Sequence, residues 1–482
     1  MTSAGHTARL QNIVRGRGRS AGDTGRPAIG MLAAMPQLTS TRRERDEPGS
    51  RAPVRDRGDA CPGALRLHAA DDGALARVRI PAGLLTASQT LALAETAEHL
   101  GDGHIDITSR GNLQLRGLDE RESVRLSSAL DAVGLLPSPR HERVRNVLAS
   151  PLNGLDSLGG ADVRCWAARL DGLLCASEAA TGLSGRFLFA LDDGRGDVAA
   201  LDADVTLIAL HGRPSRALLR VGDEAEGVCV AGEDAPGAAL LAAEVFLTEV
   251  RESGEHAWRV RELPVRELPY GQALFARRLA ELLGSRGVTA QRVTNPAPAP
   301  AGTAPAPGIV DGGGNRCALS VMAPLGRLTS SQWRQLASLA REHGNGELRV
   351  TPWRGIVVPG LPRSGAGTWL QELDEAGLIT HEGSSWLGVG ACTGLPGCAR
   401  SHRDVRADAA AALNGPATGR MLPVYWSGCE RRCGRPQGDR VDVVAGEDGY
   451  TVTVQAEGST RERAVPDGDL AHAVASARAE RE

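Results

Sequence analysis

The sequence contains no lysine, so all 55 of its basic Lys-plus-Arg side chains are arginine. This absence excludes a Schiff-base lysine, a pyridoxal-phosphate anchor and the phosphate-binding lysine of a P-loop. Any anion that the protein binds has to be held by guanidinium groups, which pair with carboxylates through two parallel hydrogen bonds.

Long apolar runs are also missing. No run approaches the roughly 18 residues that a membrane helix needs, and the start of the chain has no apolar segment typical of a signal peptide. The net charge of −3 argues against general binding of nucleic acid. We therefore expect a cytoplasmic protein with neither nucleic acid nor membrane as a partner. Clustered thiols in a reducing compartment indicate metal or redox chemistry rather than disulfides.

The length of 482 residues exceeds what one hydrophobic core usually supports, so several domains are expected. Residues 1–60 are rich in Arg, Gly and Pro without periodicity, which predicts a disordered tail. Met31 and Met35 within this tail are alternative starts of translation. Residues 295–309 contain NPAPAPAGTAPAPG, which predicts an extended Pro/Ala linker.

The two parts flanking this linker contain a repeat. Residues 80–118 and 323–361 align without a gap, and 14 of 39 positions are identical. In each copy a threonine, Thr86 or Thr329, is a predicted N-cap of a helix. The helix is expected to stop at a glycine, Gly101 or Gly344, and to be followed by a strand. A duplicated unit of this kind predicts two lobes related by a pseudo-twofold axis, with a cleft between them.

Four of the nine cysteines form two short pairs near the end of the chain, C-x5-C at Cys392 and Cys398 and C-x3-C at Cys429 and Cys433. Structural zinc favours pairs two to four residues apart, so the first spacing suits zinc poorly. A disulfide pair is a second alternative. Four thiolates at uneven spacing favour a [4Fe–4S] cluster. The other five cysteines are predicted to be small buried apolar residues: Cys61, Cys165, Cys175, Cys229 and Cys317.

Polar residues recur at even spacing in the first repeat, at Arg110, Asn112, Gln114 and Arg116. On a strand they would project from one face. A solvated strand is the ordinary interpretation, but the second repeat supplies Arg354 at the matching strand. A cleft lined by arginines from both repeats would suit a ligand with many carboxylates.

The cysteine pairs, together with the duplicated strand of the I-T-x-R-x-N-x-Q-L-R-G type, resemble the sulfite and nitrite reductase family over roughly residues 60–480. The resemblance implies an α+β fold. Two ferredoxin-like half-domains, related by a pseudo-twofold axis, are each followed by an α/β domain. The implied boundaries are 61–135 and 136–294 for the first pair, and 310–380 and 381–482 for the second, which carries the cysteines.

Within that family the likeness is strongest to the precorrin-3B synthases, on CPGALRLHAADDGALARVRIPAG (61–83), LRVTPWRGIVVPGL (348–361) and SGCERRCGRP (427–436). These are O2-dependent monooxygenases of aerobic cobalamin biosynthesis, which convert precorrin-3A to precorrin-3B by C20 hydroxylation and γ-lactone formation. The reductases' K-F-K stretch has Arg186-Phe187-Leu188 as its counterpart here, so a leucine replaces one cation. This departure favours the synthase over a sirohaem-dependent sulfite or nitrite reductase. A non-catalytic zinc or iron–sulfur binding module is a further alternative.

The resemblance also implies cofactors and partners. Cys392, Cys398, Cys429 and Cys433 would ligate a [4Fe–4S] cluster, and a non-haem iron is implied, with His402 and Asp404 as the nearest candidate ligands. Sirohaem belongs only to the reductase alternative. No G-x-G-x-x-G opens a βαβ unit, so electrons are expected from an external ferredoxin or flavoprotein reductase. The residues expected at the tetrapyrrole substrate are Arg77, Arg79, Arg110, Asn112, Gln114, Arg116, Arg145, Asn146, Arg186 and Arg354.

Overall fold

The structure is a computed structural model. It describes residue 59 and the ranges 61–210, 216–264, 273–296, 302–413, 421–436, 438–456 and 458–479. Apart from Asp59, the predicted tail 1–60 lies outside the described residues, as do residues 297–301 of the predicted linker. No helix in the described ranges is long and apolar enough to cross a membrane.

The two repeats form two five-stranded sheets with the same strand order. The first sheet contains, in spatial order, β1 (His68–Ala70), β2 (Gly73–Val78), β5 (Leu113–Leu118), β4 (His104–Ile107) and β14 (Arg327–Thr329). The second contains β12 (Gly308–Asp311), β13 (Arg316–Met322), β16 (Gly355–Pro362), β15 (Glu347–Val350) and β3 (Leu84–Thr86). The short strand before the helix of each repeat therefore joins the sheet of the other repeat. This reciprocal exchange confirms the predicted pseudo-twofold relation.

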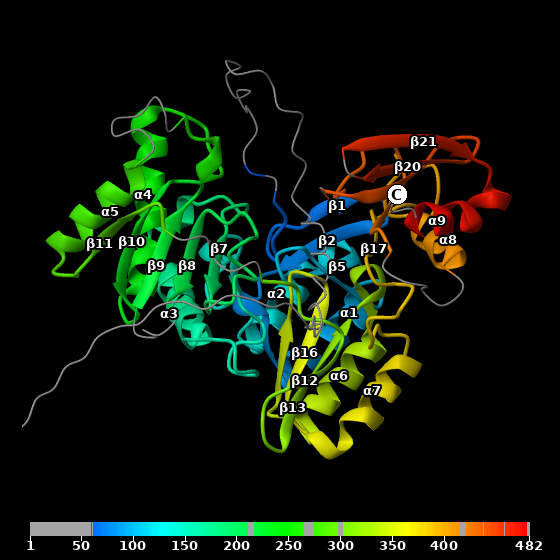
Figure 1. The fold of residues 1–482 in the computed structure, drawn as a ribbon, viewed down its shortest axis with the longest axis horizontal. Coiled ribbons are helices and arrows are strands. Elements are labelled where there is room, and N and C mark those ends of the chain that lie inside the picture. Colours follow the sequence, from blue (N-terminus) through cyan, green and yellow to red (C-terminus); the bar gives the residue numbers. More distant parts are fainter. Residues whose placement is uncertain are drawn as a thin grey trace, which may run out of the picture. The chain divides into compact units, whose positions relative to one another are not determined.

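Four helices cover these sheets, and they are α1 (Ala87–Leu100), α2 (Ser123–Ala132), α6 (Ser330–Glu342) and α7 (Ala366–Glu375). Helices α1 and α6 pack against each other, and one hydrophobic core contains residues of both repeats. Figure 1 shows α6 and α7 beside β12, β13 and β16.

The starts of α1 and α6 follow from their sequences. Thr86 accepts a hydrogen bond from the Gln89 amide at 3.1 Å, and the Gln89 side chain accepts one from the Thr86 amide at 3.0 Å. Thr329 and Gln332 form the same capping box, so both predicted N-caps are confirmed. Helix α1 ends at Gly101 as predicted, whereas the C-cap of α6 is His343, one residue before the expected glycine.

The chain between the repeats forms a third sheet with its own core. Its strands, in spatial order, are β11 (Gln291–Thr294), β10 (Glu226–Ala231), β9 (Arg216–Val221), β8 (Val205–Ala209), β7 (Phe189–Asp192) and β6 (Val147–Ala149). The accompanying helices are α3 (Val163–Ala176), α4 (Ala235–Ser253) and α5 (Leu274–Ser285). Strands β6, β7 and β8 run parallel, and β8 to β11 are antiparallel.

The C-terminal region forms a fourth sheet and a separate core. Its strands are β17 (Val389–Ala391), β18 (Val424–Ser427), β19 (Arg440–Ala445), β20 (Tyr450–Ala456) and β21 (Ser459–Val465), with helices α8 (Val405–Ala412) and α9 (Leu470–Ala479). Strands β17 and β18 are parallel neighbours. Because their carboxyl ends lie at the same edge of the sheet, the two cysteine-bearing loops that follow them start side by side.

Candidate functional site

Two equivalent turns present arginines at the site. Strand β4 ends at Ile107, and residues 108–112 form a turn in which Gly111 has φ +61°. The interpretation of residues 110–116 as one continuous strand face is therefore wrong, because the chain reverses at Gly111. In the second repeat, Arg354 occupies the position of Gly111 and has φ +63°. A non-glycine residue in this region is uncommon and strained, which is typical of functional positions.

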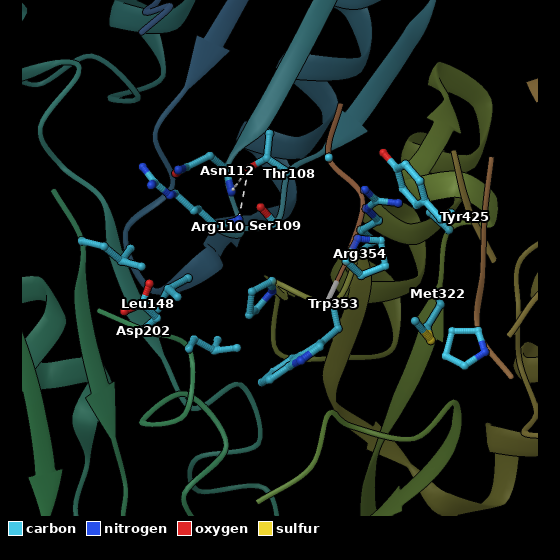
Figure 2. Close-up of a pocket in the computed structure, with 18 of the residues that line it drawn as sticks. Thr108, Ser109, Arg110, Asn112, Leu148, Asp202, Met322, Trp353, Arg354 and Tyr425 are labelled. Atoms are coloured by element: carbon cyan, nitrogen blue, oxygen red, sulfur yellow. Dashed lines mark hydrogen bonds between the residues drawn. The ribbon is translucent and has the colours of Figure 1, made fainter. Parts of the chain in front are cut away.

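A threonine hydroxyl group stabilises each turn by accepting a backbone hydrogen bond. The Thr108 side chain accepts a hydrogen bond from the Asn112 amide at 3.2 Å, and the Thr351 side chain accepts one from the Gly355 amide at 3.1 Å. The two turns line one cavity of about 570 Å³. Figure 2 shows Arg110 and Asn112 on one side of this cavity and Arg354 on the other.

The cavity wall is rich in arginine. Five arginines line it, and they are Arg77, Arg110, Arg186, Arg259 and Arg354. Among its described lining residues, Asp202 is the single carboxylate. The wall also contains apolar side chains, among them Leu148, Leu188 and Trp353. A ligand with a flat apolar body and several carboxylates matches both kinds of side chain in the wall.

Four of these five arginines have no carboxylate partner. In the part of the chain that the structure describes, Arg259 pairs with Asp204 at 2.5 Å, whereas no ion pair is formed by Arg77, Arg110, Arg186 or Arg354. The Nε atoms of Arg77 and Arg354 are buried without a hydrogen-bond acceptor among the described residues. Burial lowers the pKa of Arg110 to about 10, with the charge of Arg259 as a second cause. Burying a cation without an anionic partner raises the free energy of the folded protein. An anionic ligand in the cavity would offset this cost by pairing with the arginines.

Arg186 and its neighbours also contribute to the wall. The Arg186 guanidinium lies over the Trp258 ring, with its Cζ atom 4.5 Å from the ring centroid. Phe187 is fully buried, and Leu188 faces the cavity. Leu188 stands where the K-F-K stretch of the reductases has its second lysine, and it adds apolar surface to the cavity instead of a cation.

Five of the predicted substrate residues do not line this cavity, and they are Arg79, Gln114, Arg116, Arg145 and Asn146. Most of their polar groups already have partners within the fold, although one terminal nitrogen of Arg79 is buried without an acceptor among the described residues. Arg116 pairs with Asp72 at 2.7 Å, and Arg145 pairs with Asp171 at 2.7 Å. Asn146 accepts a hydrogen bond from Asn112 at 2.9 Å and so supports a lining residue from behind.

Two of these residues have further contacts near the site. The Gln114 side chain accepts a hydrogen bond from Arg77 at 3.0 Å. Arg79 is 2% exposed and donates to the Arg143 carbonyl at 3.0 Å. Burial lowers the pKa of Arg79 to about 9, with the neighbouring charges of Arg77 and Arg110 as further causes.

The four clustered cysteines lie on the two loops that follow β17 and β18. The loops are joined by backbone hydrogen bonds, and the His402 amide donates to the Gly428 carbonyl at 2.8 Å. The Gly428 amide donates to the Cys392 sulfur at 3.2 Å. Burial raises the pKa of Cys392, and the nearby Cys433 and Cys429 raise it further. The thiols of Cys429 and Cys433 are therefore close enough to Cys392 to act on its charge.

The two cysteine loops carry the donor set of a [4Fe–4S] cluster. Four thiols on two adjoining loops, with an amide donor at one sulfur, match the donor set and hydrogen bonding that such clusters use. Within the described ranges, no group of three or more His, Cys, Asp or Glu side chains is arranged to hold a single metal ion. A cluster is a different case, because each thiolate binds a separate iron atom. The donor chemistry fits the cluster, and no site for a mononuclear iron is identified in the described chain.

The candidate iron ligands lie elsewhere. Asp404 caps helix α8 by accepting a hydrogen bond from the Ala407 amide at 3.1 Å, and His402 is exposed. Neither residue lines the arginine cavity. The prediction that the five remaining cysteines are all buried is wrong: Cys165 is exposed, and Cys61 is half-buried and lines the cavity.

The sequence analysis also missed lining residues. Arg259, Trp353 and Tyr425 face the cavity but belong to segments far apart in the chain. Trp353 directly precedes Arg354 and aligns with Arg110 of the first repeat, so the alignment of the two repeats could have identified it. Arg259 and Tyr425 carry no local pattern that would reveal their position.

Comparisons with known proteins agree with this architecture. The family model described as "Nitrite/Sulfite reductase ferredoxin-like half domain" matches residues 68–133 and 310–376. Ferredoxin–nitrite reductase of Synechococcus elongatus is 28% identical over 75% of this chain and 74% of its own length. Precorrin-3B synthase of a Sinorhizobium species is 26% identical over 83% of each chain. The solved structure of Mycobacterium tuberculosis NirA protein has a TM-score of 0.63 at 19% identity, covering 85% of this chain and 82% of that one, which shows a shared fold.

Proposed function

Because the chain carries both ferredoxin-like half domains of the nitrite and sulfite reductase family, we propose that it is an oxidoreductase of the precorrin-3B synthase type. Its substrate would be precorrin-3A, which the arginine cavity binds as a polycarboxylated macrocycle. The observation that carries this proposal is the set of cavity arginines without carboxylate partners among the described residues, which are Arg77, Arg110, Arg186 and Arg354.

The chemistry of the cavity favours a synthase over the reductase alternative. A site that reduces nitrite or sulfite has to hold a small anion next to its redox centre, and cations serve that purpose. Leu188 places apolar surface where the second cation of the reductases is expected, beside Leu148 and Trp353. An apolar wall suits dioxygen, which has no charge to compensate. Arg186 alone remains as the cation of this stretch.

The proposed reaction balances as a monooxygenation. One oxygen atom of O2 would bond to C20, and the other would leave as water after taking up two electrons and two protons. The oxygen of the ring-A acetate would then bond to C1, which consumes the C1–C20 double bond, and the proton of that carboxylic acid would end on the C20 oxygen as the hydroxyl, so that no second oxidant is needed. The loops with Cys392, Cys398, Cys429 and Cys433 would hold a [4Fe–4S] cluster, which supplies electrons one at a time when bound. An external ferredoxin or flavoprotein reductase would provide the electrons.

The chain's own residues have defined tasks in this scheme. Arg77, Arg110 and Arg354 orient the macrocycle by pairing with its carboxylates from two sides. Trp353 and Leu188 exclude water from the face of the ring that they contact.

The decisive experiment reconstitutes the full chain anaerobically and then adds precorrin-3A, O2 and a reductant. Under the proposal the product gains one oxygen atom by mass spectrometry. The alternative, a sirohaem-dependent sulfite or nitrite reductase, predicts instead the absorption bands of a bound isobacteriochlorin and consumption of nitrite or sulfite. Strong isobacteriochlorin bands in the purified protein, with no oxygenated product, would overturn the synthase assignment.

A further inference from the structure

One side chain contacts both the arginine cavity and a cysteine loop. Tyr425 lies on β18, is 2% exposed and lines the cavity. Its hydroxyl donates a hydrogen bond to the Cys433 carbonyl at 2.7 Å. Figure 2 shows Tyr425 on the same side of the cavity as Arg354.

Two glycines make room for this contact. A Cβ atom on Gly434, which has φ +82°, would lie 2.6 Å from the Tyr425 hydroxyl. A Cβ atom on Gly390 would lie 2.9 Å from the Tyr425 ring and 3.4 Å from a terminal nitrogen of Arg354. Distances under 3.0 Å are too short for carbon atoms in contact, so larger residues at either position would displace Tyr425. The ring is thus closely packed against Gly390 and Gly434, while it also lines the cavity.

Arg354 is the adjoining charged group on the cavity side. Its Nε atom is buried without an acceptor in the described chain, so a ligand carboxylate that pairs with this guanidinium changes the electrostatic environment of the neighbouring tyrosine. On the other side, the position of the Cys433 carbonyl depends on the Tyr425 hydrogen bond. A change at the cavity therefore has a short physical route to the cysteine loop, through two side chains.

We propose that Tyr425 is a positioning residue that couples occupancy of the arginine cavity to the Cys433 loop. Ligand binding then shifts the reduction potential of the cluster held by that loop. The inference rests on the proposed cavity ligand and cluster, but not on the reaction that follows. By reciprocity, the cluster's oxidation state changes the ligand affinity by the same factor.

The test uses the full chain with its cluster reconstituted anaerobically, and metal-free sirohydrochlorin as an unreactive polycarboxylated probe. Probe affinity is measured by optical titration of the oxidised and the dithionite-reduced protein. We expect about a tenfold difference in wild type, which equals a shift of about 59 mV for a one-electron couple. An EPR-monitored redox titration with and without the probe measures that shift independently.

The variants separate coupling from stability. Tyr425→Phe removes the hydroxyl and keeps the ring. It should reduce the difference in probe affinity between the oxidised and the reduced protein to about threefold or less. Gly434→Ala should act in the same direction by pushing on the hydroxyl. Tyr450→Phe is the matched control, because Tyr450 is 3% exposed in the same sheet and its hydroxyl donates to Asp408 instead. It should keep the wild-type difference.

The proposal is overturned if wild type binds the probe equally in both oxidation states, or if Tyr425→Phe keeps the full difference. Equal losses in Tyr425→Phe and Tyr450→Phe would also overturn it, because they would indicate general loosening of the sheet. The synthase assignment is tested separately. If the protein shows the coupling but does not oxygenate precorrin-3A, this inference stands and the proposed function is wrong.

Discussion

Leu85 of the first repeat is the backbone partner of Leu348 of the second, and both side chains are at most 1% exposed. On the other side of the pseudo-twofold axis, Leu328 pairs with Ile105 in the same way. Each repeat therefore donates a strand to the sheet of the other. The two half-domains share backbone hydrogen bonds as well as a hydrophobic core, so they should unfold together.

Leu85→Ala tests this mutual dependence. The side chain is buried in the shared core, and its truncation should lower the free energy of unfolding by about 2–5 kcal/mol. Urea denaturation followed by circular dichroism should show one transition for both half-domains, displaced to lower urea. Val124→Ala is the control, since that side chain is 72% exposed and should change stability by less than about 0.5 kcal/mol. Separate transitions for the two repeats would contradict the prediction.

The sequence revealed the repeat and both capping boxes because these depend on local signals: a threonine, a glutamine three residues later and a helical period. It did not reveal the strand exchange. Leu84–Thr86 and Arg327–Thr329 are only three residues long, and nothing in so short a strand states which sheet it joins. The partner is chosen by long-range packing, which no local pattern encodes.

Arg110 and Arg116 should respond in opposite ways to replacement by glutamine. Arg110 has no ion pair within the described chain, so Arg110→Gln should leave stability nearly unchanged and weaken tetrapyrrole binding about 10- to 100-fold. Arg116 pairs with Asp72 and donates to the Gly397 carbonyl at 3.2 Å, within the Cys392–Cys398 loop. Arg116→Gln should cost about 3 kcal/mol of stability.

Sirohydrochlorin titration measures the first effect, and urea denaturation measures the second. Arg116→Gln should also lower the iron content after reconstitution, because it releases one anchor of the cysteine loop. If Arg116→Gln weakened probe binding as much as Arg110→Gln while remaining stable, the assignment of the cavity arginines would be wrong.

This contrast marks the limit of sequence reasoning about the site. Even spacing grouped Arg110, Asn112, Gln114 and Arg116, but the first two belong to the turn of residues 108–112, whereas the last two follow it on a strand. Arg110 and Asn112 reach the cavity, while Gln114 and Arg116 are on β5 with partners inside the protein. Residue type predicted that arginines would line a cleft. Which arginines do so depends on backbone dihedrals and on acids such as Asp72, which lie elsewhere in the sequence.

Cys398→Ser tests the cluster assignment. If four thiolates hold the cluster, loss of one should sharply reduce the reconstituted iron and sulfide content and bleach the broad visible absorption. Cys165→Ser is a suitable control, because Cys165 is an exposed thiol on α3 in another domain. It should keep the wild-type iron content. Full cluster content in Cys398→Ser, or one zinc without sulfide in wild type, would exclude the proposed ligand set.

A buried carboxyl group gives the protein a pH-dependent stability. Asp197 is 2% exposed and accepts hydrogen bonds from the Ser150 hydroxyl at 2.6 Å and the Val198 amide at 2.7 Å. Its second oxygen is buried without a hydrogen-bond donor in the described chain, and the nearest cation is the Arg195 guanidinium at 3.9 Å. Burial, and then the charge of Asp192, raise the pKa of Asp197 to about 7, although Arg195 partly opposes the shift.

The sign of the effect follows from linkage. Below the ordinary aspartate pKa of about 3.9, the folded and unfolded chains are both protonated at this site. Between that value and about 7, the unfolded chain releases the proton while the folded chain retains it. The folded state then binds more protons, so its stability falls as the pH rises through this window and is constant above it.

Asp197→Asn should remove this dependence, because the amide has nearly the same shape but no charge to bury. At pH 4 the variant and wild type should have similar free energies of unfolding, since wild-type Asp197 is then neutral. At pH 8 the variant should be more stable by an amount on the order of a few kcal/mol. Urea denaturation at both pH values measures this difference. Asp131→Asn, on the exposed surface of α2, should show no such change between the two pH values. If Asp197→Asn lowered the free energy of unfolding equally at pH 4 and pH 8, the prediction would be wrong. The contribution of Asp197 to stability would then come from its hydrogen bonds and not from its protonation state.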